Sequence, residues 1–110
     1  MTYQEACIKL YKLDNINVVE QFILRDILVT LDFYSFEIDG IISLDCEIEI
    51  TAYYKNYLIV IGYDANKPFF ISQNYNNKMI SYEEFGTTDE IGEHLLFLKT
   101  VYDEVEFINE

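Results

Sequence analysis

The stretch Tyr57–Ile71, YLIVIGYDANKPFFI, decides the fold. Its first five residues are apolar without interruption, and Gly62 and a polar turn separate them from a second short apolar run, Phe69–Ile71. An apolar run of this length between turn residues is typical of a β-strand that is buried on both faces. We therefore expect a central strand over Tyr57–Tyr63.

The residues before this stretch alternate strictly between two kinds of side chain. The alternation predicts a buried face with Cys46, Ile48, Ile50, Ala52 and Tyr54, and a solvent face with Asp45, Glu47, Glu49, Thr51 and Tyr53. Such a pattern indicates a strand with one wet face. Because only Lys55 and Asn56 connect it to the central strand, we expect the two strands to pair antiparallel.

Further strands are expected on both sides of this pair. Turn residues over Asp64–Pro68 and Asn74–Asn77 delimit two more strands, Phe69–Gln73 and Lys78–Tyr82. Partial alternation within Phe33–Ile42 predicts a short strand before all of these. The sequence thus predicts an antiparallel β-meander of about four to five strands.

Three capping boxes mark the starts of helices. In each, a Thr or Asn is followed three residues later by Glu, so that both side chains accept hydrogen bonds from free N–H groups: Thr2 with Glu5, Asn17 with Glu20, and Thr87 with Glu90. We expect the first helix to end at Asp14 and Asn15, the second to span Val18–Leu28, and the third to fray from Asp103 onward. Several β-branched residues of the second segment would also suit a strand, but Asp26 in its middle favours a helix.

The order of elements predicts an α+β protein. N-terminal helices, an antiparallel meander and a C-terminal helix would pack as a helical layer over one side of a sheet. A chain of 110 residues fits a single domain, residues 1–110. We expect a cytoplasmic protein, because Glu5 stands where a signal peptide would be basic or apolar, and no apolar run approaches the ~18 residues of a membrane span.

The balance of charge indicates what the protein binds. Twenty acidic residues against seven basic ones give a net charge of −13. Nucleic-acid binding needs a basic surface, and anionic membranes attract basic segments, so we expect neither as a partner. A basic protein is the partner that such a charge favours. Solubility alone is the alternative explanation.

Catalytic and metal-binding patterns are absent from the sequence. It contains no glycine-rich phosphate loop, nucleophile elbow, zinc motif or Cys/His cluster, so we predict neither an enzyme nor a cofactor. The single histidine, His94, has no evident partner that would orient it, and we interpret it as structural. Cys7 and Cys46 are too few for a disulfide framework.

The strand acids are better candidates for binding than for catalysis. Neighbours on one face of a strand lie about 7 Å apart, too far for two carboxylates to share a proton. A stripe of acids beside an aromatic residue is, however, typical of a surface that binds a basic protein. We therefore predict a partner-binding surface, and an ordinary solvated strand face is the alternative. Its residues are Asp45, Glu47, Glu49, Tyr53 and Asp64.

The second half of the chain resembles a known superfamily. The resemblance is carried by Ile61-Gly62, Asp64, Pro68–Ile71, Asn76-Asn77, Met79–Tyr82 and Phe97-Leu98. This succession of an apolar strand, an acidic turn, two further strands and a closing helix is similar to the SMI1/KNR4 (SUKH) superfamily.

The resemblance implies an immunity protein, a non-catalytic inhibitor that binds and neutralises a cognate bacterial toxin, often a nuclease or deaminase. The alternative is an acidic nucleic-acid mimic of the anti-CRISPR type, encoded by a phage against a host defence nuclease. Its mimicking acids would be Glu83, Glu84, Asp89, Glu90 and Glu93. A small enzyme or ligand-binding domain would instead need a pocket with converging polar groups. Whether the protein is a monomer or a homodimer is left open.

Overall fold

A computed structural model of the chain describes the backbone of residues 1–45 and 47–109, and all side chains of these ranges except those of Lys67 and residues 106–109. The elements follow in the order α1 (Tyr3–Tyr11), α2 (Val18–Phe33), β1 (Glu37–Ser43), β2 (Ile48–Tyr54), β3 (Tyr57–Asp64), β4 (Lys67–Tyr75), β5 (Lys78–Phe85) and α3 (Thr88–Asn109). The predicted α+β class, with a meander between N-terminal helices and a C-terminal helix, is confirmed. The predicted position of Cys46 lies outside the described residues.

The sheet contains five antiparallel strands in the order of the sequence, β1-β2-β3-β4-β5. Strand β3 is central, and Ile61 pairs with Ile50 of β2 and Ile71 of β4. The predicted antiparallel pairing across the Lys55-Asn56 turn is therefore confirmed. Asn76 and Asn77 both have positive φ angles, 52° and 63°. Such angles are required at both central residues of a type I′ hairpin turn, and Asn adopts them more readily than most residues.

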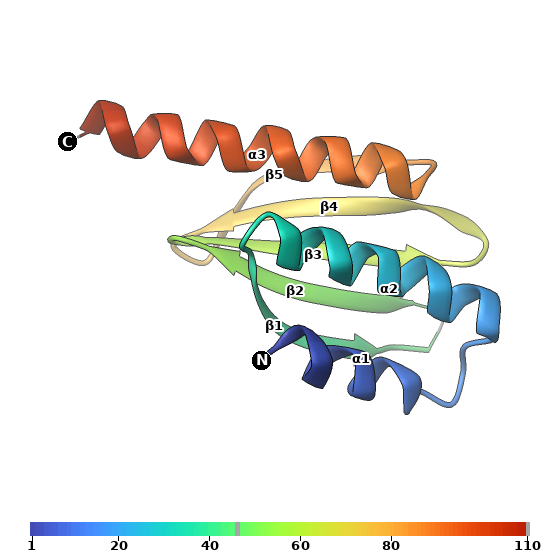
Figure 1. Cartoon of the computed structure of the whole chain (residues 1–110). Helices are drawn as coiled ribbons and strands as arrows, with labels where there is room; N and C mark the ends of the chain where they lie inside the picture. Colours follow the sequence, from blue (N-terminus) through green and yellow to red (C-terminus); the bar gives the residue numbers. More distant parts are fainter. Residues whose placement is uncertain (46, 110) are drawn as a thin grey trace.

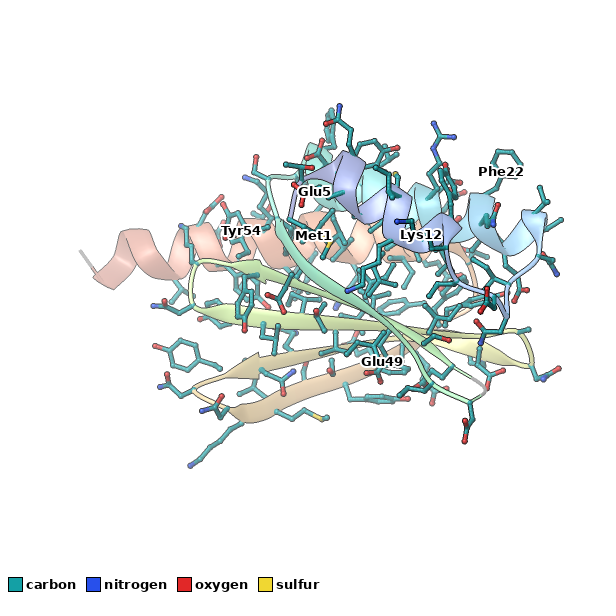
Figure 2. The ribbon with its side chains drawn as sticks, turned by 90° about the horizontal axis from the view of Figure 1, so that it is seen from below. Met1, Glu5, Lys12, Phe22, Glu49 and Tyr54 are labelled. Carbon is teal, nitrogen blue, oxygen red and sulfur yellow. The ribbon has the colours of Figure 1, made fainter. Side chains whose placement is uncertain are left out.

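The three helices form one layer on one face of the sheet (Figure 1). Helix α1 contacts β1, α3 contacts β5, and α2 lies between α1 and α3. Figure 1 also shows that α2 and α3 run in the same direction. Seen with its side chains, the helical layer presents Phe22 on its outer side, pointing away from the sheet (Figure 2). The largest fully buried side chains lie between the two layers: Leu10, Leu24, Ile27, Leu28, Leu31, Ile50, Ile59, Ile61, Ile71, Ile91 and Leu95.

Hydrogen bonds confirm the predicted capping residues. The Thr2 and Asn17 side chains accept from the backbone N–H groups of Glu5 and Glu20 at 3.1 and 2.8 Å. At the start of α3, the Thr87 hydroxyl accepts from the N–H of Glu90 at 3.2 Å. The Glu90 carboxylate there accepts from the Thr87 hydroxyl at 3.3 Å, so only the first half of the predicted box is confirmed. These contacts are local in sequence, which is why a short motif was sufficient to predict them. None of the helices in the described part is both long and apolar enough to cross a membrane.

The predicted ends of the elements need correction. Helix α1 ends at Tyr11, before the predicted stop at Asp14 and Asn15. Helix α2 continues beyond Leu28 to Phe33, because Leu31 extends its buried stripe by one more turn. The predicted strand at Phe33–Ile42 consequently begins only at Glu37, after Ser35 reverses the chain with a φ of 65°. Strand β2 begins at Ile48, two residues later than the alternation predicted.

The prediction that α3 frays from Asp103 is also wrong, since the helix continues to Asn109. Asp103 is held against the end of the sheet. Its carboxylate accepts a hydrogen bond from the Tyr54 hydroxyl at 2.6 Å and pairs with the ammonium groups of Lys55 at 2.8 Å and Lys99 at 3.2 Å. The contacts with Tyr54 and Lys55, which are distant in sequence, stabilise a segment whose own composition is merely acidic.

Strand β3 is buried on one face rather than on both. Ile59 and Ile61 point into the helical layer and are buried. Leu58 and Val60 point the other way and are half-buried, because no described helix lies on that side. The continuous apolar run therefore reflects a second, uncovered face that is itself apolar.

Candidate functional site

The uncovered side of β2–β5, here called the open sheet face, is the candidate binding surface. Its outward residues are fixed by strand alternation and register. Val60 pairs with Thr51 on one side and Ser72 on the other, and Ser72 pairs with Tyr82. The set is Glu49, Thr51 and Tyr53 on β2, Leu58, Val60 and Gly62 on β3, Phe70, Ser72 and Asn74 on β4, and Met79, Tyr82 and Glu84 on β5.

The centre of the open sheet face is aromatic. The Phe70 ring crosses Gly62 so closely that a Cβ at that glycine would lie 1.8 Å from Phe70 Cε1. The same ring stacks on Tyr82, with 5.2 Å between centroids. Gly62 is therefore required for this close approach, as glycines within strands often are.

Side chains of the open sheet face also cover one another. Ser72 is only 4% exposed although no described helix covers it. Val60 and Tyr82 flank it on the neighbouring strands, and the Asn74 amide lies 3.4 Å from its hydroxyl. The centre of this face is thus partly desolvated before any partner binds, which reduces the polar surface that binding would have to dehydrate.

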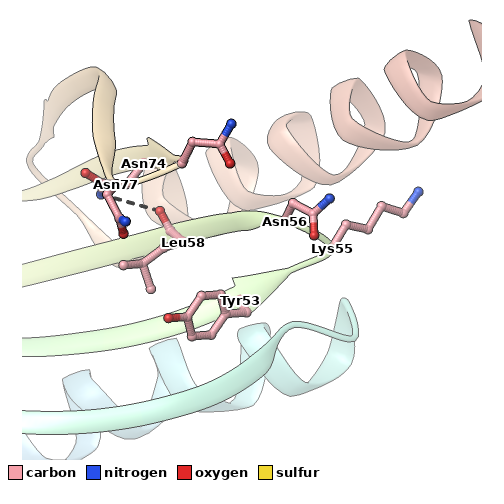
Figure 3. A pocket seen from close by; sticks show the side chains of 7 residues that line it. Tyr53, Lys55, Asn56, Leu58, Asn74 and Asn77 are labelled. Atoms are coloured by element: carbon pink, nitrogen blue, oxygen red, sulfur yellow. Dashed lines mark hydrogen bonds between the residues drawn. The ribbon is translucent and has the colours of Figure 1, made fainter. Parts of the chain in front are cut away.

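One end of the open sheet face is hollowed between the β2–β3 and β4–β5 turns (Figure 3). The hollow has a volume of about 550 Å³ and is lined by Tyr53, Lys55, Asn56, Leu58, Asn74, Asn76 and Asn77. The Asn74 amide donates to the Leu58 carbonyl at 3.5 Å, and Figure 3 shows Lys55 leaving the turn toward α3. Amides and a phenol both donate and accept hydrogen bonds, so this hollow suits polar side chains or peptide groups of a partner.

At the opposite end of the sheet, beside the start of α2, carboxylates gather. Asp45, Glu47 and Asp64 line a hollow of about 280 Å³ together with Glu20, the capping residue of α2. The Tyr63 hydroxyl donates to Glu20 Oε2 at 3.0 Å. Burial and this acidic acceptor together raise the pKa of Tyr63 to about 12, so the phenol remains a donor at any physiological pH.

Glu49 connects this acidic end to the open sheet face. Its partial burial, and next the proximity of Glu47, raise the pKa of the Glu49 carboxyl. Both effects disfavour the negatively charged form of Glu49 next to Glu47. A cation supplied by a partner would stabilise that charged form. Within the described part, no group of three or more His, Cys, Asp or Glu side chains has the geometry to hold a metal ion.

The structure divides the predicted site residues between two places. Asp45, Glu47 and Asp64 come together at the acidic end. Tyr53 lies near the polar hollow, about 13 Å along β2 from Glu49 by strand geometry. The sequence prediction did not include the aromatic centre, Phe70 and Tyr82. A local signal for it existed, since burial of Phe69 and Ile71 on one face requires Phe70 to point to the other.

His94 belongs to the helix side of the sheet. Its ring lies 4.8 Å from that of Phe85 and 5.9 Å from that of Phe97, and its Nδ1 is 3.6 Å from a Glu83 carboxylate oxygen. Burial lowers the pKa of His94, and Glu83 partly opposes that shift. At neutral pH the ring therefore acts mainly as a packing group between two aromatic residues.

Comparison of the chain with protein-family models, curated proteins and solved structures finds no match in any of the three.

Proposed function

We propose that this protein is a non-catalytic inhibitor of the immunity type, which binds a basic protein through its open sheet face. The observation that carries the proposal is the composition of that face. An aromatic centre, Phe70 and Tyr82, lies between acidic residues on both sides, Glu49 and Glu84. Aromatic residues at the centre of a patch and charged residues at its rim are the arrangement of specific protein interfaces.

The two parts of the face have different physical roles. Burial of the rings against a partner supplies most of the affinity, because a few aromatic anchors at the centre of an interface carry most of the binding energy. The carboxylates at the rim and at the acidic end attract a basic partner over long range and exclude acidic ones. A net charge of −13 extends this attraction beyond the face itself.

The placement of basic residues supports the same surface. Lys9, Lys12 and Arg25 belong to α1, its C-cap and α2. Lys55 and Lys99 are engaged by Asp103 on the helix side. The charged members of the open sheet face itself, Glu49 and Glu84, are both acidic, and a toxin with a basic nucleic-acid-binding cleft is the partner class that complements them.

The nucleic-acid mimic has weaker support. Of its proposed acids, Glu84 lies on the open sheet face, whereas Glu83 faces His94. Asp89 and Glu90 lie in the first turn of α3, where the helix dipole favours negative charge for structural reasons. These acids occupy different surfaces, and a mimic of one phosphate backbone needs them on one.

Affinity capture from the native host tests the proposal. The baits are the wild-type protein, Tyr82→Ser on the open sheet face, and Ile8→Ser on α1 as a control of similar exposure. We expect a basic toxin or nuclease in near-stoichiometric amount with the wild type and the control, and at least about tenfold less with Tyr82→Ser. Equal capture by all three baits, or no basic protein with any, would refute the proposal.

A charge-reversal variant examines the acidic end separately. Replacing Asp45, Glu47 and Glu49 by Lys should weaken binding of the captured partner mainly through a slower association rate. Unchanged association kinetics would remove the acidic end from the interface.

A further inference from the structure

The outer side of α2 carries a continuous apolar stripe. Its members are Val18, Phe22, Val29 and Phe33, with Arg25 at the centre. These residues lie opposite the buried side of the helix, which contains Leu24, Ile27, Leu28 and Leu31. Val18, Phe22 and Phe33 are 65%, 62% and 79% exposed. Single exposed apolar residues are ordinary, but a row of them along one helix marks a contact surface.

The spacing of the stripe is palindromic. Phe22 and Val29 lie three positions outward from Arg25 and Asp26, respectively, and Val18 and Phe33 lie four positions farther out. If a second α2 packs antiparallel about the point between Arg25 and Asp26, Phe22 faces Val29 of the second copy. Val18 then faces Phe33 of the second copy. Such self-complementarity is what a two-fold symmetric interface requires.

A hollow beside the stripe matches this register. It has a volume of about 270 Å³ and is lined by Tyr11, Val18, Gln21, Phe22 and Arg25. In the antiparallel register, Phe33 of the second copy faces Val18 and therefore reaches this hollow. The Phe33 ring, the most exposed of the stripe, would thus enter the hollow beside Val18 of the other copy, as a knob enters a hole between packed helices.

Charge at the centre of the stripe is complementary as well. Arg25 donates from Nε to the Tyr3 hydroxyl at 3.3 Å, and no carboxylate in the described part forms an ion pair with it. In the antiparallel register, Arg25 meets Asp26 of the second copy, and the symmetry forms this pair twice. A parallel arrangement would instead bring the two Arg25 side chains together.

We propose that the chain forms a homodimer by antiparallel packing of α2 against α2 of a second copy. The stripe lies on the outer side of the helical layer, and the open sheet face lies on the other side of the molecule (Figure 2). The dimer is therefore independent of the proposed inhibitor function and presents two open sheet faces outward.

Salt distinguishes this contact from binding of a basic partner. Two copies with a charge of −13 each repel one another at long range, and added salt screens that repulsion. The apolar contact itself is insensitive to moderate salt. Dimerisation should therefore strengthen as salt rises, whereas binding of a basic protein should weaken.

Sedimentation equilibrium tests the dimer. A wild-type protomer of 13.0 kDa should form a species of twice that mass between about 5 and about 200 μM in about 500 mM salt. Phe22→Glu should raise the dimer dissociation constant at least about tenfold. Met79→Glu on β5 is the matched control, because Met79 is also 62% exposed and the charge change is identical. A monomeric wild type at every concentration, or equal effects of the two variants, would overturn the proposal.

A charge swap tests the register and does not depend on Phe22. Arg25→Asp and Asp26→Arg should each weaken the dimer, because each brings like charges together. The double variant restores opposite charges across the two-fold axis and should return the dissociation constant to within about threefold of the wild type. If the double variant is as weak as the single ones, the antiparallel register is wrong. Circular dichroism of each variant verifies that α2 stays folded.

Discussion

At the scale of single residues, contacts distant in sequence determine what a residue does. A glycine within a strand pattern, such as Gly62, indicates a bulge or a close approach of other atoms to the backbone. In the structure the register with β4 shifts between Gly62 and Asp64, and the missing side chain of Gly62 leaves room for the Phe70 ring. Asp103 looks like one acid among many in a frayed terminus, but it is contacted by Tyr54 and Lys55 at the β2–β3 turn and by Lys99 of its own helix.

Replacing Gly62 by Ala should destabilise the protein by about 1–2 kcal/mol, since the Phe70 ring must leave its place and lose its stack on Tyr82. Gly40→Ala is the control, because a Cβ there meets Thr51 Oγ1 at an ordinary 3.5 Å. Urea unfolding of both variants measures the difference. Equal loss in the two variants would show that strand propensity, and not the ring contact, is the cause.

Asp103→Asn should lower the free energy of unfolding by about 1 kcal/mol at pH 7. The expected effect is this small because the Asp103 side chain is half-exposed and solvent screens its ion pairs. Hydrogen bonds from Lys55 and Tyr54 hold the pKa of Asp103 well below its usual range. As pH falls, the unfolded chain therefore takes up this proton first, and the stabilisation diminishes from about pH 4 downward. Unfolding curves of the wild type and variant should converge over that range, and a constant difference down to pH 3 would contradict this account.

How far the sequence could predict individual residues depends on the range of their contacts. Glu49 and Tyr53 were correctly placed on a solvent face, because the two-residue period of a strand is a local property. Whether a second layer covers the outward side of β3 depends on the whole topology, which a local apolar run does not contain. The burial predicted for Leu58 and Val60 was therefore wrong.

At the scale of elements, the starts of helices were predictable and their ends were not. Capping boxes are contained within four residues, so Thr2, Asn17 and Thr87 identified three helix starts. The ends of α2 and α3 depend on packing against the sheet, which extends both helices beyond the point where the composition indicated a stop. Register, in contrast, followed from short turns and alternation.

Glu20 shows how one residue can serve two elements. Its Oε1 accepts from the N–H of Asn17 at 3.1 Å, and its Oε2 accepts from the Tyr63 hydroxyl at 3.0 Å, which joins the start of α2 to β3. Glu20→Ala removes both bonds and should cost about 1–2 kcal/mol in thermal or urea unfolding. Glu20→Gln preserves an acceptor and a second polar group, and should retain most of that stability. A Gln variant as unstable as the Ala variant would show that the charge, rather than the two hydrogen bonds, is responsible.

At the scale of the whole molecule, the two sides have different surfaces. The helical side carries an apolar stripe with a balanced Arg–Asp centre, which suits another copy of the same chain. The open sheet face carries aromatic rings among carboxylates, which suits a basic protein. Because the helices lie on one side of the sheet, both contacts can form at once. The charge of −13 was readable from composition, but its distribution between these surfaces required the fold.

The central claim is that the open sheet face binds a basic partner. The most direct test compares the affinity for the captured partner of two double variants that have the same net charge. Glu49→Lys/Glu84→Lys reverses charges on that face, and Glu93→Lys/Glu104→Lys reverses two exposed acids of α3. At about 50 mM salt, calorimetry should show at least a tenfold loss of affinity for the first variant and less than a threefold loss for the second, and the gap should narrow at about 500 mM salt. Equal losses in the two variants would contradict the claim and would mean that only net charge attracts the partner.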